Sequence, residues 1–249
     1  MDAFKGKSAL VVGASSGIGR ATVLALAAQG ARVWAVARNR ERLERIAREA
    51  AGEVKAIVGD ASDPDVAARA LRESDPSMIV VSLGAHARLA PIDEQTWESF
   101  SEVWNADLKA SFHLGQEALR RPLAPGSRVL FLSSGAAIGG SPLSGGYAGA
   151  KRMQWFLAGY LQKRSEARKL GIRFTAVVPK QLVAGTEIAE EAGAAYAALA
   201  GISVETFMGR FGAPLTAEGV ASALLEILGG KVDAQADALG VTGTGIEAL

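Results

Sequence analysis

Residues 8–37 read SALVVGASSGIGRATVLALAAQGARVWAVA, and the class of fold can be predicted from them. Apolar, β-branched runs at 8–14 and 31–37 flank a helical pattern at 18–29, so the stretch predicts a strand, a helix and a second strand. A right-handed crossover through the helix places the two strands parallel in one sheet. The sequence therefore begins with the building unit of an α/β fold.

The alternation of strand and helix continues along the chain. The further apolar runs are nearly continuous, which is typical of strands buried on both faces of a sheet. We expect strands at 54–60, 78–84, 127–134 and 172–179 and a short one near the C-terminus, with helices at 40–50, 63–73, 94–120, 147–170 and 216–228. These elements predict an α/β fold: a doubly wound parallel sheet of about seven strands, with helices on both faces and ligands at the carboxyl ends of the strands.

Length and composition fit one globular domain. The chain has 249 residues, of which 49% are hydrophobic and 21% charged, and no linker or repeat divides it, so we expect a single domain over 1–249. Residues 187–212 interrupt the alternation with an alanine-rich helical stretch and are predicted to form a small helical substrate lid. The apolar side chains of this lid either close over a hydrophobic substrate or pack on their own domain: Ile188, Tyr196, Phe207, Met208 and Phe211.

Charge and residue counts exclude several function classes. Lys and Arg number 27 against 26 Asp and Glu, so the net charge of +1 gives no field that attracts nucleic acid or anionic lipid. With no cysteine and two histidines, we expect no disulfide, no thiolate nucleophile and no metal site. No stretch has the apolar composition of an export signal or a membrane span, so a cytoplasmic protein is expected.

The turn between the first strand and its helix has an anion-binding pattern. Gly13 permits a tight turn, Gly17 lets backbone N–H groups approach a pyrophosphate, and Gly19 lets the helix pack closely on the sheet. The loop is completed by Ser15, Ser16 and Ile18. The GxxxGxG spacing differs from the GxGxxG dinucleotide fingerprint, but its position between strand and helix predicts a Rossmann-type, NAD(P)-binding domain.

The end of the second strand bears on the choice of cofactor. A carboxylate there would accept a hydrogen bond from the 2′-hydroxyl of NAD, whereas an arginine matches the 2′-phosphate of NADP. The strand is followed by Arg38, Asn39 and Arg40, and the first carboxylate is Glu41. We therefore expect NADP(H) rather than NAD(H). The alternative is that Arg38 and Arg40 form a solvated face of the next helix.

Tyr147 and Lys151 form a candidate proton-transfer pair. They stand four residues apart in a predicted helix and so share one of its faces. A free tyrosine has a pKa of about 10, and a neighbouring ammonium group lowers it towards neutral pH. Ser134 ends the strand at 127–134, at the sheet edge where ligands bind in this architecture.

Together these motifs resemble the short-chain dehydrogenase/reductase (SDR) family, which combines a GxxxGxG turn, a serine after the fifth strand and YxxxK. The resemblance covers nearly the full chain and marks it as a divergent member. It implies that Ser134 binds the substrate oxygen, that Tyr147 is the acid or base, and that Lys151 holds the nicotinamide ribose and tunes Tyr147. It also implies a homodimer or homotetramer, with the helix after Tyr147 at one interface. Further cofactor contacts are implied at Asp60, Ala61 and Gly84.

Some positions depart from the family pattern. The family's catalytic asparagine falls on Asp107, which either holds a water as the asparagine does or pairs with Lys151 and offsets its charge. Asn105 would reach the same helix face only through a local bulge. Lys180 stands where the family has a glycine beside the nicotinamide, and Thr186 stands about two residues after the position of a cofactor-binding threonine.

The sequence thus predicts an NADPH-preferring oxidoreductase. Hydride would pass between nicotinamide C4 and a small, fairly apolar ketone, aldehyde or secondary alcohol. The alternative is a catalytically impaired cofactor-binding regulator or scaffold of the same fold, which would tolerate changes such as Asp107 and Lys180. His113 is expected to pack against its helix, whereas His86 lies at the ligand edge, where it either faces the substrate or plays no part in binding.

Overall fold

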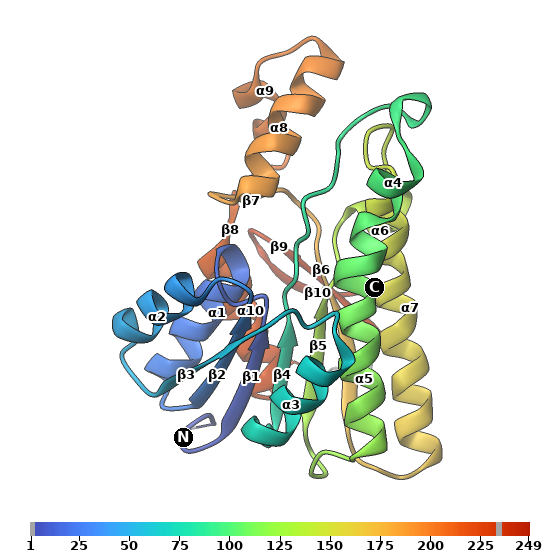
Figure 1. Ribbon diagram of the computed structural model, residues 1–249. Helices are drawn as coiled ribbons and strands as arrows, with labels where there is room; N and C mark the ends of the chain where they lie inside the picture. Colours follow the sequence, from blue (N-terminus) through green and yellow to red (C-terminus); the bar gives the residue numbers. More distant parts are fainter. Residues whose placement is uncertain (1–2, 233–235) are drawn as a thin grey trace.

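The protein is built on one large, mostly parallel sheet. In the computed structural model, which describes residues 3–232 and 236–249, its eight strands lie in the order β10-β9-β6-β5-β4-β1-β2-β3 (Figure 1). Neighbouring strands are parallel except for β9 and β10. The strands are β1 (Ser8–Val12), β2 (Arg32–Ala37), β3 (Val54–Val58), β4 (Met78–Val81), β5 (Arg128–Leu132), β6 (Arg173–Pro179), β9 (Ala238–Thr242) and β10 (Gly245–Ala248).

The eighth strand is a small correction to the expected number of about seven. The single short strand expected near the C-terminus is instead a hairpin, in which Thr242 pairs with Gly245 across a two-residue turn. β10 therefore runs antiparallel to β9 at the edge of the sheet. A separate two-stranded sheet joins β7 (Val183–Ala184) to β8 (Leu215–Thr216).

Helices cover both faces of the sheet, as predicted for a doubly wound fold (Figure 1). One face carries α1 (Gly17–Ala28), α2 (Arg40–Glu49) and α10 (Ala217–Leu228). The other carries α3 (Pro64–Ser74), α5 (Lys109–Arg120) and α7 (Gly146–Ala167). The chain winds in both directions from the centre of the sheet, where β1 lies beside β4.

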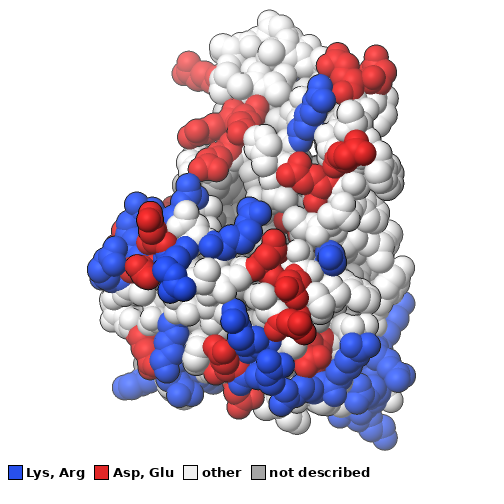
Figure 2. Space-filling view, in the orientation of Figure 1, with Lys and Arg blue, Asp and Glu red and all other residues white. Residues whose placement is uncertain are grey.

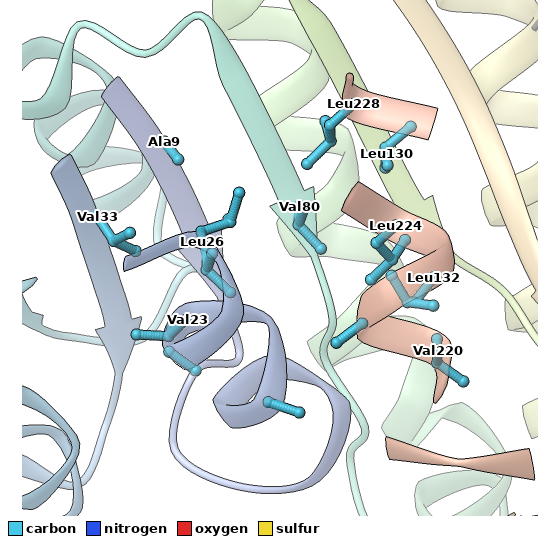
Figure 3. Packing of buried hydrophobic residues seen from close by; sticks show 14 of the residues in the cluster. Ala9, Val23, Leu26, Val33, Val80, Leu130, Leu132, Val220, Leu224 and Leu228 are labelled. Atoms are coloured by element: carbon cyan, nitrogen blue, oxygen red, sulfur yellow. The ribbon is translucent and has the colours of Figure 1, made fainter. Parts of the chain in front are cut away.

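Two apolar cores, one on each face, explain the continuous apolar strands. In β1, Ala9 and Val11 belong to the core under α1 and α10, whereas Leu10 and Val12 belong to the opposite core. Successive strand residues point to opposite faces, so both sets must be apolar. Figure 3 shows the first core, where Leu26 of α1 lies over the sheet between its strands. Burying one such side chain stabilises the fold by about 1.5–3 kcal/mol.

The expected single helix at 94–120 is divided in the structure. A short 3-10 turn, η1 (Ile92–Glu94), comes before α4 (Trp97–Val103). A capping box starts α4 as a new helix, because the Thr96 side chain accepts from the Ser99 N–H and the Ser99 side chain accepts from the Thr96 N–H. A π-helical turn, η2 (Trp104–Leu108), then joins α4 to α5. The prediction of one uninterrupted helix was therefore wrong at its start and in its middle.

The segment expected to form a lid stands away from the sheet. Its helices α8 (Glu187–Ala200) and α9 (Val204–Gly209) project beyond the body of the molecule, with the short α6 (Ala136–Gly139) and α4 across from them (Figure 1). Among the described residues, no helix combines the length and the apolarity that crossing a bilayer requires.

Candidate active site

A deep cleft runs along the carboxyl ends of the central strands. Its volume is about 470 Å³, and it is lined by the loops that follow β1, β2, β3, β4, β5 and β6. Figure 2 shows the surface hollowed below the α8–α9 projection, with positive and negative side chains interspersed over this face. The cleft brings together most of the predicted site residues: Gly13, Ser15, Ser16, Gly17, Ile18, Arg38, Asp60, Ala61, Gly84, Asp107, Ser134, Tyr147, Lys151 and Thr186.

The glycine turn has no room for side chains at two of its positions. Gly13 has a φ of +83°, and a Cβ atom there would lie 2.3 Å from the Ser82 carbonyl oxygen. A Cβ on Gly19 would lie 2.1 Å from the Gly13 carbonyl oxygen, so this glycine allows α1 to pack closely against the turn. Gly19 does not line the cleft. Gly17 has a φ of +49°, and a Cβ there would make an ordinary van der Waals contact with Thr186 at 3.5 Å.

The start of α1 is open to an anion. Ser16 is the N-cap, but its side chain makes no capping hydrogen bond. The first N–H groups of a helix have no partner within the helix, and they carry the positive end of its dipole. A Gly-rich cradle at a helix start fits the pyrophosphate of a dinucleotide.

The far end of the cleft has the groups expected for an adenosine. Arg38 lines the cleft after β2, whereas Arg40 lies 3.9 Å from Glu44 along α2. The two arginines therefore differ in position, and only Arg38 faces the cleft. The Ser62 backbone N–H donates to Asp60 at 2.9 Å and lowers the pKa of this carboxyl; burial opposes the effect, and Arg38 adds to it.

The predicted proton-transfer residues meet at the inner end of the cleft. Tyr147 starts α7, and the Lys151 Nζ lies 5.7 Å from the centre of the Tyr147 ring. Ser134 follows β5, and its Oγ accepts a hydrogen bond from the Ala136 N–H at 3.2 Å. The neighbouring Ser133 donates its hydroxyl to the Lys151 carbonyl oxygen at 2.8 Å, which ties β5 to α7 and sets the spacing of the group.

Lys151 is buried in an ion pair with Asp107. Its Nζ donates to Asp107 Oδ2 at 2.8 Å, and their side chains are 3% and 1% exposed. Burial by itself would lower the pKa of Lys151, but the Asp107 carboxylate and, to a smaller extent, Tyr147 hold this pKa above its usual value. Of the two roles predicted for Asp107, holding a water or pairing with Lys151, the ion pair with Lys151 is present in the structure. Asn105 is exposed, and its amide donates to Ser101 at 3.3 Å, so it does not enter the site.

A second pocket of about 350 Å³ opens from the cleft. The two share a wall that includes Ser134 and Tyr147, so both residues border both spaces. Three aromatic rings of the lid segment line the second pocket, with Tyr196 stacked on Phe207 at 5.9 Å and Phe207 edge-on to Phe211 at 5.6 Å. The Tyr196 hydroxyl also contacts the Ser141 hydroxyl across the pocket.

The remaining lid side chains have different surroundings. Ile188 lies on the shared wall, and its Cδ1 is 2.8 Å from where a Cβ on Gly84 would stand, so α8 touches the loop after β4. Met208 packs its sulfur 3.5 Å from the Cβ position of Gly193, within the lid segment.

Lys180 does not close the cofactor cleft. Its ammonium forms an ion pair with Glu247 of β10 at 2.5 Å, and its side chain crosses Gly240 of β9. Thr186 is the N-cap of α8, with its hydroxyl accepting from the Ala189 N–H at 3.3 Å while it lines the cleft beside the glycine turn.

The two histidines occupy different places. His86 lines the cleft and is 72% exposed, with its Nδ1 at 3.3 Å from Glu191 of α8. His113 is partly buried on α5, and burial, with a further contribution from Lys109, lowers its pKa. It lines neither pocket.

Sequence reasoning missed Gln181. Its amide nitrogen donates to the carbonyl oxygens of Phe211 and Ala213 at 2.7 and 2.9 Å, and its amide oxygen accepts from the Gly243 N–H at 2.7 Å. Gln181 thus fastens the base of the lid segment to the turn between β9 and β10. Its partners are main-chain groups, which leave no mark in the sequence.

Comparisons with known proteins show which family the chain resembles over most of its length. The family model described as short chain dehydrogenase matches residues 7–197. The L-xylulose reductase of Cavia porcellus is 40% identical over 121 residues, and the carbonyl reductase [NADPH] 2 of Sus scrofa is 36% identical over 129 residues. The alignment with the L-xylulose reductase covers 49% of this chain and 49% of the relative, and the alignment with the carbonyl reductase covers 51% and 52%. The chain therefore matches about half the length of these curated relatives.

Solved structures share the fold over almost the whole chain. A levodione reductase superimposes with a TM-score of 0.84 at 22% identity and covers 96% of this chain and 97% of its own. An NAD+-bound xylitol dehydrogenase gives a TM-score of 0.84 at 20% identity, with 96% and 99% covered. With a family match over 7–197 and a glycine turn, serine, tyrosine and lysine that line one cleft, the chain belongs to the short-chain dehydrogenase family.

Proposed function

We propose that the protein is a cytoplasmic, NADPH-preferring oxidoreductase that reduces a small, fairly apolar ketone or aldehyde, or oxidises the matching secondary alcohol. The observation that carries the proposal is the wall of Ser134 and Tyr147 shared by the dinucleotide-sized cleft and the apolar pocket. A substrate in the pocket and a nicotinamide in the cleft would meet at these two hydroxyl groups. We also propose that 1–249 acts as one domain, with 187–212 as its lid.

The cofactor cleft fits NADP(H). When bound, this cofactor supplies the hydride to the substrate carbon or takes it away. The glycine turn and the open start of α1 would hold the pyrophosphate, and Arg38 would offer a planar guanidinium to the 2′-phosphate. The carbonyl reductase relative is named for NADPH, which supports the same preference.

The protein's own groups would handle the proton and the substrate oxygen. Ser134 donates a hydrogen bond to that oxygen, and in the reductive direction Tyr147 Oη gives it a proton. Lys151 stands next to Tyr147 and fixes the electrostatic surroundings of its ring. Closure of the aromatic lid residues over the pocket would exclude water from the reacting atoms.

The lining of the second pocket favours an apolar substrate. A sugar ketose carries a hydroxyl on most of its carbons, and each buried hydroxyl needs a polar partner. Polar residues also line the pocket, among them Ser141, Ser144, Lys180, Gln181 and Glu191, but most of its exposed wall is apolar: Ala85, Ala87, Leu89, Leu182, Ile188, Ala192, Phe207 and Phe211. We therefore place the substrate among apolar carbonyl compounds rather than among the sugars for which several relatives are named.

A cofactor-binding regulator or scaffold is the second candidate. The Asp107–Lys151 pair favours it, because a lysine tied to a carboxylate differs from the family pattern. Against it stand the intact Ser134 and Tyr147 and the pocket beside them.

Thermal unfolding with each cofactor, followed by a carbonyl screen, tests the proposal. At 100 times its dissociation constant, NADPH should stabilise the fold by about 2.7 kcal/mol, a shift of roughly 5–11 °C in Tm. NADH should give a smaller shift, and Arg38→Ala should remove the difference while Arg40→Ala keeps it. With NADPH present, cyclic and aryl ketones should be consumed faster than L-xylulose. A shift without consumption of any carbonyl would favour the regulator.

A further inference from the structure

In the buried Asp107–Lys151 pair, the Asp107 carboxylate offsets the positive charge of Lys151 beside Tyr147. The Lys151 ammonium has three N–H donors, and they go to Asp107 Oδ2 at 2.8 Å, the Leu83 carbonyl oxygen at 2.9 Å and the Leu132 carbonyl oxygen at 3.3 Å. The other carboxylate oxygen of Asp107 accepts from the Ala85 N–H at 3.0 Å. The +1 and −1 charges thus lie side by side in a site shielded from water.

The backbone holds Asp107 in this position. It lies in the π-helical turn η2, and its carbonyl oxygen accepts from the Ser111 hydroxyl at 2.7 Å and from the Gln154 amide at 3.4 Å. Gln154 stands on α7, the helix that also carries Tyr147 and Lys151. The carboxylate is therefore fixed relative to both residues rather than free to turn away.

We propose that Asp107 is a positioning residue that offsets the charge of Lys151 at the Tyr147 ring, so that the site is suited to carbonyl reduction rather than alcohol oxidation. This inference rests on the proposed function. In reduction the Tyr147 O–H bond breaks as its proton forms a bond to the substrate oxygen, and the cofactor's hydride goes to the substrate carbon. In oxidation the same oxygen must be a phenolate to take the proton back. A lone ammonium beside the ring favours the phenolate, and a neutral ion pair does so much less.

Other charged groups face the same spaces and remain in place in the test. Asp107 and Tyr147 are the groups that act on the charge of Lys151. The two pockets are also lined by Arg38, Asp60, His86, Glu102, Lys180, Glu187 and Glu191. Lys180 is paired with Glu247, and His86 with Glu191. Since none of them changes when Asp107 is replaced, a difference between the wild type and the variant reports the change at position 107.

The pH profile of Asp107→Asn tests the inference. The amide is nearly isosteric and removes the negative charge, but it keeps one oxygen, which can accept from either the Ala85 N–H or Lys151 Nζ and not from both. The pH above which carbonyl reduction is lost should fall by about one unit or more. The pH below which alcohol oxidation is lost should fall by a similar amount. Glu190→Gln, which removes an exposed carboxylate of α8 that lines neither pocket, should leave both limits unchanged. A uniform loss of activity with unmoved limits would overturn the inference.

A second readout does not depend on turnover. The chain has three tyrosines, and tyrosinate formation can be followed by near-ultraviolet absorbance. In Asp107→Asn one tyrosine should ionise at lower pH than in the wild type, and adding Tyr147→Phe should abolish that early step. Equal titrations of the wild type and Asp107→Asn would overturn the inference even if no carbonyl substrate is found. An early step in a protein that reduces no carbonyl would support the charge offset while rejecting the proposed function.

Discussion

Lys151 supports the fold as well as the site. Lys151→Met leaves the Asp107 carboxylate buried without a counter-charge, so we expect it to lower the free energy of unfolding by about 3–5 kcal/mol at neutral pH. Because the pKa of Lys151 is raised on folding, the pair stabilises the protein below about pH 10.4 and loses its contribution as the pH rises through the folded-state pKa. The difference in free energy of unfolding between the wild type and Lys151→Met should therefore become smaller in strongly alkaline solution.

Urea unfolding of a double-mutant cycle measures this contribution. Lys151→Met with Asp107→Leu removes both charges and should recover part of the lost stability, since two apolar groups can replace a buried pair. If Lys151→Met alone unfolds at the same urea concentration as the wild type, the pair does not stabilise the fold.

Among single residues, the side chains of the site could be predicted from the sequence, but the hydrogen bonds and the ion pair that hold them in place could not. Ser134, Tyr147 and Lys151 could be named because their types and spacing carry the chemistry, and they do line one cleft. The carbonyl oxygens of Leu83 and Leu132 that hold Lys151 could not be predicted, because every residue has one. The choice between a water and an ion pair at Asp107 also depended on distances that only the fold sets.

At the element scale, the aromatic stack of α8 and α9 is expected to bind substrate. Phe207 is the middle ring, between Tyr196 and Phe211. Phe207→Ala removes apolar contact in the second pocket, so the KM for an apolar ketone should rise about tenfold. The KM for NADPH should stay the same, because Phe207 does not line the cofactor cleft.

The matched control is Leu199→Ala, which shortens a side chain of α8 that is 57% exposed and lines neither pocket. Steady-state kinetics of both variants separate the two roles open to the lid. An unchanged KM for the ketone in Phe207→Ala would mean that the aromatic rings only pack on one another.

The elements that were predicted well are those with a strong apolar period. The strands β1, β2, β4, β5 and β6 were visible because both of their faces are largely buried, whereas the edge strand β3 was visible from its apolar run although Lys55 and Ala56 are exposed. The predicted helix at 216–228 begins and ends within one residue of α10. The break before α4 was missed because a Thr96–Ser99 capping box is a weaker signal than the period around it. The β9–β10 hairpin was missed because β10 is short and largely exposed.

At the scale of the whole molecule, we expect a homo-oligomer with α7 at an interface. Phe156 and Tyr160 stand one turn apart on α7, stacked at 6.5 Å and 44% and 57% exposed. Large exposed aromatic side chains next to each other are typical of interfaces between proteins. Replacing both with glutamate should lower the mass measured by light scattering to that of a monomer of 25.7 kDa.

Ile92→Glu is the control for this change, because Ile92 is also a large exposed apolar residue, 67% exposed, but belongs to η1 rather than to α7. It should leave the measured mass unchanged. If the wild type is itself a monomer at the concentrations used for activity, the proposed assembly is wrong.

Carbonyl reduction by NADPH, compared between the wild type and Tyr147→Phe, tests the role of Tyr147 as the acid. The phenylalanine ring keeps the shape of the shared wall and removes the hydroxyl that supplies the proton. We expect kcat/KM for an apolar ketone to fall by about 100-fold or more, while the shift in Tm with NADPH remains. Equal activity in the two proteins, with NADPH bound to both, would contradict the assignment of Tyr147 as the acid.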